Sequence, residues 1–243
     1  MNPATPTISV LIPLYNGARY VRETLDSVLT QSVPVSEIVV VDDGSTDDGP
    51  AIVESVEKVR LVQKPHSGPA ATLNRAFTEA RGEVLAFVDA DDLWTPGKLE
   101  RQLAVLTASS SPLFVFGHAK NFHSPDLTDD EKTRIHCPPD PIPAVTLGTM
   151  LARRTDVLRV GDIGTQWQVG YFVDWYSRAQ ALGIRAEMLP DVLLHRRLHR
   201  TNLSRTQPQA RPDFARILKS VLDRKRAAGS SPASDGALPT NSP

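Results

Sequence analysis

Residues 84–92 read Val-Leu-Ala-Phe-Val-Asp-Ala-Asp-Asp, an apolar run followed at once by three carboxylates. A short run with little polar alternation is typical of a strand that a sheet buries on both faces. Comparable runs occur at 8–12, 37–41, 59–63 and 113–116. Between them, helices are expected at 21–29, 47–57, 70–80 and 95–108, the last with Thr95 as its N-cap. This alternation predicts an α/β fold with a mostly parallel central sheet and helices on both faces.

Polar residues gather directly after three of these strands. Residues 15–17 (Tyr-Asn-Gly) follow the first strand, 42–45 (Asp-Asp-Gly-Ser) the second and 89–92 (Asp-Ala-Asp-Asp) the fourth. Because ligands of open α/β sheets bind at the carboxyl ends of the strands, we expect these three segments to meet at one edge and to form a binding site.

The three carboxylates of residues 89–92 repel one another, so their proximity needs a compensating charge. A divalent cation supplies it, and oxygen ligands of this kind suit Mg²⁺ or Mn²⁺. The alternative is a solvated acidic turn that caps the next helix. A position directly behind a buried strand favours the cation site.

Composition excludes several classes of protein. The net charge of −1 gives no global case for nucleic-acid binding, and the single cysteine, Cys137, excludes a disulfide scaffold and a Cys-based zinc site. The chain has no G-x-x-x-x-G-K-[ST] loop and no G-x-G-x-x-G after the first strand. Neither a signal peptide nor a transmembrane helix is predicted, and the expected location is cytoplasmic.

Charge is distributed unevenly along the chain. Residues 196–226 hold ten Lys or Arg and two Asp, whereas residues 1–195 carry more acidic than basic side chains. A solvated helix face is one interpretation of the basic segment. The alternative is a positive rim for phosphate or an acidic partner, including peripheral contact with a membrane.

The second half of the chain is less regular. Residues 121–146 contain five prolines and no clear period, which predicts a long loop over the site. Regular structure is expected again at 146–160 and 174–182, with a helix at 212–226. We therefore expect one domain over 1–226, divided into halves 1–117 and 118–226, and a disordered tail at 227–243.

The chain resembles family 2 glycosyltransferases with the GT-A fold. The segments that carry the resemblance, in chain order, are Val10-Leu-Ile-Pro-Leu-Tyr-Asn-Gly17, Glu23-Thr-Leu-Asp-Ser-Val-Leu-Thr-Gln31, Val39-Val-Val-Asp-Asp-Gly-Ser-Thr-Asp47, Ala80-Arg-Gly-Glu-Val-Leu-Ala-Phe-Val-Asp-Ala-Asp-Asp-Leu-Trp94, Phe172-Val-Asp-Trp-Tyr-Ser-Arg178 and Arg196-Arg-Leu-His-Arg-Thr-Asn-Leu-Ser204. The combination and its order are specific.

The resemblance implies an inverting transfer of a sugar from a nucleoside-diphosphate sugar, with Mn²⁺ or Mg²⁺ as cofactor. Residues 1–117 would form the nucleotide-sugar half and 118–226 the acceptor half. Tyr15 would pack on the base, Asp43 would bind its edge and Asp92 would face the sugar. The donor-binding residues implied in this way are Pro13, Tyr15, Asn16, Asp43, Asn74, Asp89 and Asp92, and the metal-binding residues are Asp89, Asp91 and His199.

The match departs from the family pattern at the catalytic base. Many members carry Glu-Asp where this chain has Tyr171 and Phe172, so we predict Asp174, the nearest carboxylate, as the base. Its alternative role is the N-cap of a helix starting at Trp175. Relatives also carry Arg where this chain has Leu73, which removes one expected donor contact.

Two other functions compete with a transferase that acts on a glycan, a small molecule or a peptide. One is a catalytically silent module that binds nucleotide or a partner, which the missing Glu-Asp pair favours and the intact carboxylates at 89 and 91 oppose. The other is a nucleotidyltransferase, which would need a Gly-rich basic loop after the first strand. Residues 17–19 (Gly-Ala-Arg) are too short for that.

Overall fold

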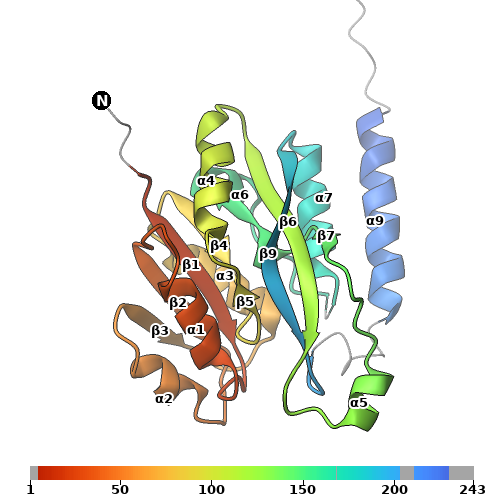
Figure 1. Cartoon of the computed structure of the whole chain (residues 1–243). Helices are drawn as coiled ribbons and strands as arrows, with labels where there is room; N and C mark the ends of the chain where they lie inside the picture. The colour runs from red at the N-terminus through yellow and green to blue at the C-terminus, as the bar shows by residue number, and fades with distance from the viewer. Residues whose placement is uncertain (1–4, 168, 203–210, 230–243) are drawn as a thin grey trace, which may run out of the picture.

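The computed structural model describes residues 5–167, 169–202 and 211–229 (Figure 1). Its strands are β1 (Ile8–Leu14), β2 (Glu37–Asp42), β3 (Val59–Gln63), β4 (Val84–Phe87), β5 (Leu93–Trp94), β6 (Leu113–His123), β7 (Ile142–Ala144), β8 (Leu151–Arg153) and β9 (Arg185–Leu198). Its helices are α1 (Val21–Leu29), α2 (Gly49–Glu54), α3 (Pro69–Glu79), α4 (Lys98–Ala108), α5 (Asp129–Arg134), α6 (Arg154–Val160), α7 (Tyr171–Ala181) and α9 (Arg211–Gly229), with a 3-10 turn η1 (Leu147–Thr149).

The described strands form one sheet in the order β3-β2-β1-β4-β8-β6-β9-β5, and β7 pairs with the outer part of β6. Strands β3, β2, β1 and β4 are mutually parallel, and β6 and β9 are parallel to each other. Strand β8 runs antiparallel to both β4 and β6, and β5 runs antiparallel to β9. The predicted α/β fold with a mostly parallel sheet is therefore confirmed.

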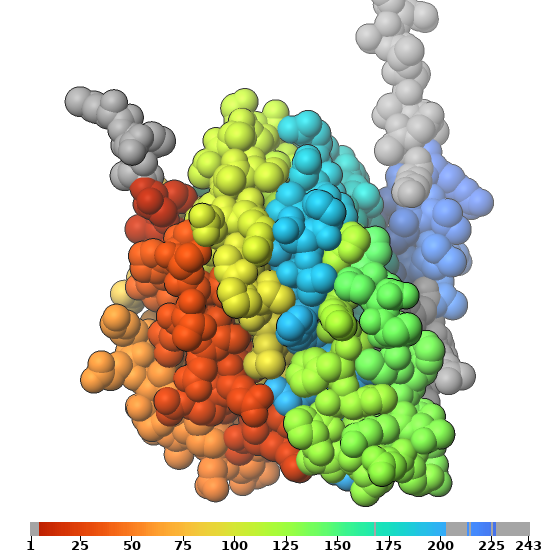
Figure 2. Space-filling model, viewed as in Figure 1, coloured from red at the N-terminus to blue at the C-terminus, as the bar shows by residue number. Residues whose placement is uncertain are grey.

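Alternating side chains of the central strands enter two separate cores. Val10 and Val40 pack in the core that α1, α2 and α4 cover, whereas Leu11 and Val39 pack in the core that α3, α6 and α7 cover. All four residues are fully buried, which explains why these strands show no polar alternation in the sequence. Figure 2 shows α1 and α4 on the near face, with part of β9 reaching the surface beside α4.

The predicted loop at 121–146 is wrong in part. Strand β6 continues to His123, α5 forms within the segment and β7 returns to pair with β6. Helix α5 has a capping box, because the Thr128 hydroxyl accepts from the backbone N–H of Glu131 and the Glu131 carboxylate accepts from that of Thr128. The five prolines interrupt the periodic pattern of apolar residues in this segment, so the sequence did not indicate these short elements.

Other predicted boundaries also need correction. Helix α4 begins at Lys98 after Gly97, whose φ is +72°, and the Thr95 hydroxyl instead donates to the Val192 carbonyl on β9. Helix α7 begins at Tyr171, so Asp174 lies in its first turn and is not its N-cap.

The C-terminal helix also runs beyond its predicted end. Helix α9 extends through residues 227–229, which were expected in the disordered tail, and the rest of that tail lies outside the described residues. Among the helices that the structure describes, none combines the length and apolarity needed to cross a bilayer.

Candidate active site

The loops that follow β1, β2 and β4 meet because these strands are neighbours in the sheet. The backbone N–H of Asn16 donates to the Ser45 hydroxyl at 2.8 Å, and the Asn16 side-chain carbonyl accepts from the backbone N–H of Thr46 at 2.8 Å. Asn16 holds a left-handed φ of +49° that brings it to this loop. The predicted convergence of the first two polar segments is thus present, and Asn16 joins them.

Asp43 is buried, and the loop after β3 surrounds its carboxylate. One oxygen accepts from the backbone N–H of Ser67 at 2.9 Å and from the Lys64 ammonium, and the other accepts from the backbone N–H of Gly68 at 2.8 Å. Burial alone would raise the pKa of Asp43, but these hydrogen bonds outweigh it and lower the pKa below its ordinary value. The carboxylate is therefore ionised at neutral pH and acts only as an acceptor.

Tyr15 projects from the end of β1 with 51% of its surface exposed. Its ring centroid lies 4.4 Å from that of His66, and the His66 imidazole Nδ1 lies 2.9 Å from the Asp43 carboxylate. Sequence reasoning missed Lys64 and His66. The same rule that located the other segments would have found them, because they directly follow β3, which lies parallel to β2.

Two other predicted donor residues have structural partners here. Pro13 lies within β1 opposite Val41 of β2. The Asn74 amide donates to the Ile163 carbonyl at 2.9 Å and accepts from the Ile163 backbone N–H at 2.8 Å. Both hydrogen-bonding groups of Asn74 thus tie α3 to the segment before α7, and this geometry does not support its predicted donor contact.

The carboxylates of Asp89, Asp91 and Asp92 form one cluster after β4. One oxygen from each lies within 4.8 Å of the others, with Asp89 exposed and Asp92 buried. Although Asp89 reaches solvent, desolvation by the surrounding protein, together with the charge of Asp91, raises the pKa of Asp89 to about 6. Burial and the same repulsion raise the pKa of Asp92 well above its ordinary value. A hard divalent cation relieves such repulsion, so the donor set fits Mg²⁺ or Mn²⁺.

His199 joins this cluster from the end of β9. Its Nε2 lies 2.7 Å from Oδ2 of Asp91, and its Nδ1 lies 2.9 Å from the Thr201 hydroxyl. The Asn202 amide donates to the same Asp91 oxygen at 3.3 Å. His199 is therefore held beside the acidic cluster, more than 100 positions away in sequence from Asp91, as the resemblance implies.

Arg197, near the end of β9, is buried beside the cluster. Its Nε donates to the Asp91 carbonyl at 2.9 Å, and its backbone N–H donates to the Asp92 carboxylate at 2.8 Å. The guanidinium lies 4.8 Å from the ring centroids of both Tyr20 and Phe122. Arg197 thus supports the acidic cluster from below.

The neighbouring Arg196 and Arg200 differ in their surroundings. Arg200 pairs with Asp126 and Glu131 at the surface, and these two carboxylates balance its charge. The charge of Arg196, in contrast, lowers the pKa of both Asp89 and Asp92, although burial and Asp91 outweigh it. The charge of Arg196 therefore acts on the acidic cluster, in addition to the hydrogen bonds of Arg197.

Asp174 does not have the surroundings expected of a general base. Its carboxylate is buried, lies 2.7 Å from Nη2 of Arg224 on α9 and lies 3.7 Å from Nε of Arg178. Both carboxylate oxygens thus face guanidinium groups of α7 and α9, and the side chain is engaged in ion pairs within α7 and with α9. The geometry therefore assigns Asp174 to the contact between α7 and α9 and does not support its predicted role.

Tyr171 and Phe172, at the positions where many family members carry Glu-Asp, begin α7. Desolvation, and to a smaller extent the charge of Asp89, raise the pKa of the Tyr171 hydroxyl above its ordinary value. Phe172 stacks with Tyr176 and Trp175, with ring centroids 5.9 Å apart in both pairs. Neither of the two residues supplies a carboxylate, and Phe172 packs with the aromatic side chains of α7.

Comparisons with known proteins show the family of the chain. The model of glycosyl transferase family 2 matches residues 9–155. A glycosyltransferase of Nostoc sp. is 38% identical over 129 residues, which are 51% of this chain and 40% of that protein. TuaG of Bacillus subtilis, named as a glycosyltransferase of teichuronic acid biosynthesis, is 35% identical over 142 residues, which are 52% of this chain and 56% of TuaG.

Among solved structures, TarS of S. aureus (residues 1–349) in complex with UDP-GlcNAc matches with a TM-score of 0.70 and 22% identity. The match covers 90% of this chain and 66% of that one, and it supports the GT-A fold. The chain spans about half the length of the Nostoc protein and of TuaG. Because the family model covers more than half of the residues, the chain belongs to glycosyl transferase family 2.

Proposed function

We propose that this protein is an inverting, divalent-metal-dependent glycosyltransferase. It would move a sugar from a nucleoside-diphosphate sugar, with UDP as the nucleotide, to a hydroxyl or other nucleophile of an acceptor. The observation that carries the proposal is the acidic cluster of Asp89, Asp91 and Asp92 at the end of β4, beside the strand whose end carries Tyr15. The UDP and UDP-GlcNAc complexes of TarS support a UDP-sugar as the donor.

The nucleotide would lie on the half formed by residues 1–117. We propose that the base stacks on the exposed Tyr15 ring and that its edge donates to the Asp43 carboxylate. Lys64 and the two backbone N–H groups already hold that carboxylate in place, so its orientation is set before a ligand arrives. Such preorganisation reduces the entropy lost on binding.

Asp89, Asp91 and His199 would hold the metal ion, because carboxylate oxygens of Asp89 and Asp91 lie within 4.8 Å of each other and Nε2 of His199 lies 2.7 Å from Oδ2 of Asp91. When bound, Mn²⁺ or Mg²⁺ neutralises the negative charge that develops on the leaving nucleoside diphosphate. Arg196 adds positive charge on the same side. Arg197 holds the cluster through its hydrogen bonds to Asp91 and Asp92, so the carboxylates keep their spacing when the nucleotide leaves.

The acceptor would bind on the half formed by residues 118–226, and its class (a glycan, a small molecule or a peptide) stays open. In an inverting transfer its nucleophile attacks the anomeric carbon opposite the leaving diphosphate and loses a proton. A general base must take that proton, and the base role of Asp174 is a prediction that its ion pairs oppose. A cytoplasmic location also stays a prediction.

A donor screen tests the proposal. The protein is mixed with UDP-, GDP- and dTDP-sugars in Mn²⁺ or in EDTA, and release of nucleoside diphosphate is followed. Release should occur with one donor, require metal, and fall by roughly a hundredfold or more in Asp91→Asn. Asp26→Asn is the matched control, because Asp26 is an exposed carboxylate on α1 that pairs with Arg22.

Calorimetric titration with free UDP, GDP and dTDP distinguishes the remaining outcomes. Metal-dependent binding without turnover would indicate an obligatory acceptor or a catalytically silent module. No nucleotide binding in either metal condition would refute the donor site. A response of Asp26→Asn equal to that of Asp91→Asn would show that the loss comes from general charge removal.

A further inference from the structure

Helix α9 has an inner face that the domain covers. Ile217 is 1% exposed, and Arg224 donates to Asp174 at 2.7 Å and to the Ser177 hydroxyl at 2.6 Å, both on α7. Within the helix, Arg224 also donates to Ser220 at 2.9 Å. Residues 217, 220 and 224 recur at helical spacing, so one side of α9 is fixed on α7.

The outer face of α9 is apolar and exposed. Leu218 is 59% exposed and Leu222 is 44% exposed, and their spacing of four residues places them in one stripe. Lys219 and Arg226, seven residues apart, form a parallel stripe beside the leucines. In Figure 1 α9 stands at the edge of the molecule, on the side away from β3 and α2, and the exposure of Leu218 and Leu222 shows that this face of the helix is in contact with solvent.

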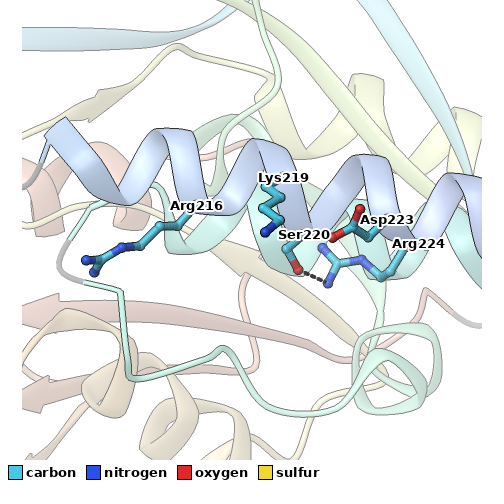
Figure 3. Close-up of a pocket in the computed structure, with 5 residues that line it drawn as sticks. All are labelled: Arg216, Lys219, Ser220, Asp223 and Arg224. Atoms are coloured by element: carbon cyan, nitrogen blue, oxygen red, sulfur yellow. Dashed lines mark hydrogen bonds between the residues drawn. The ribbon is translucent and has the colours of Figure 1, made fainter.

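A pocket of about 440 Å³ lies along the same helix. Its lining residues are Arg216, Lys219, Ser220, Asp223 and Arg224 (Figure 3). Three of these five side chains are cationic and one is acidic. The Nε of Arg224 is buried and has no acceptor among the described residues. The pocket therefore adds positive charge along the flank of α9, next to Lys219 of the outer face.

We propose that the outer face of α9 docks on an anionic lipid surface. Leu218 and Leu222 would enter the interface between head groups and acyl chains, and Lys219 and Arg226 would lie against the lipid phosphates. A second copy of the chain is a poorer occupant, because it would bring these cations against one another. The acidic body of the protein, repelled by the same lipids, would stay turned away from the surface.

Vesicle co-sedimentation of the full chain tests this inference, with vesicles of phosphatidylcholine alone or mixed with phosphatidylglycerol. We expect binding only to the mixed vesicles, with a loss at high salt. The double variant Lys219→Gln/Arg226→Gln should weaken binding by about 25-fold, since each basic side chain near the surface contributes about fivefold. Arg22→Gln/Arg134→Gln is the control, because these exposed arginines lie on α1 and α5 and the charge change is equal.

A second variant separates apolar insertion from charge. Leu218→Ser/Leu222→Ser keeps the net charge and should abolish sedimentation with the mixed vesicles, and circular dichroism checks that the helix content is unchanged. Equal binding to both vesicle types, or equal losses in the α9 and control variants, would overturn the proposal. A dimer in light scattering that the serine variant dissociates would assign the face to a second copy and would also overturn it. None of these measurements requires turnover, so the result is independent of the proposed function.

Discussion

Substitutions in the pair formed by Asp174 and Arg224 distinguish a structural role of Asp174 from a catalytic one. The Asp174 side chain is 7% exposed and that of Arg224 is 30% exposed, with 2.7 Å between Oδ1 and Nη2. Removing one partner of a fully buried pair costs about 3–5 kcal/mol. Arg224 is partly solvated and keeps Ser177 and Ser220 as partners, so we expect a smaller loss, about 2 kcal/mol, for Asp174→Asn.

For a domain of this size that loss corresponds to a decrease in Tm of about 4–8 °C. Arg224→Gln should produce a similar decrease, and the double variant should lose less than the sum, because both changes break the same contact. The assay is thermal unfolding of the four proteins, together with nucleoside-diphosphate release by each. We expect turnover to fall by similar factors in Asp174→Asn and Arg224→Gln.

The opposite result would refute this reasoning. A general base contributes about a hundredfold to ten-thousandfold to the rate. If Asp174→Asn lost that much turnover while Arg224→Gln kept nearly all of it, Asp174 would be the base despite its ion pairs. If instead both variants unfolded at the temperature of the unaltered protein, the contact between α7 and α9 would not contribute to stability.

Three further predictions concern single side chains. Tyr15→Ala should weaken UDP binding by about tenfold in calorimetry, since stacking of a base on an aromatic ring is worth about 1–3 kcal/mol. The lowered pKa of Asp43 means that its contribution to stability is present at neutral pH and disappears as the pH falls below about 4, its unfolded value. Asp43→Asn should therefore reduce the acid dependence of Tm. Burial lowers the pKa of Lys98 to about 7, so the unfolded chain binds more protons between about pH 7 and 10 and stability should rise across that range. Lys98→Met should remove that rise in Tm.

The sequence was sufficient for the part of the fold that local pattern determines. Each central strand places one residue, such as Val40, in one core and its neighbour, such as Val39, in the other, so the apolar runs were visible without any alignment. The same regularity located the polar segments at the strand ends, because adjacent parallel strands bring their carboxyl ends to one edge.

Long-range partners explain what could not be predicted. Asp174 was chosen as the carboxylate nearest to the expected positions, but Arg224, 50 residues later in the chain, determines its environment. The sequence around Arg197 does not indicate that its side chain is buried, because the rings that cover it, Tyr20 and Phe122, come from two elements distant in the chain. Strand β9 escaped detection because it mixes charged, proline and apolar residues and is buried only near its end.

The register of β9 determines which of its residues lie beside the acidic cluster. The family model ends at residue 155, yet His199, which contacts Asp91, follows β9. Strand β5 pairs antiparallel with β9 so that Leu93 faces His195, and continuing that register places Asp91 opposite Arg197, which donates to its carbonyl. A slip of one residue would exchange the two faces of β9 and turn Arg197 out of its aromatic sandwich. The spacing of the carboxylates therefore depends on a strand pairing formed more than 100 positions away in the chain.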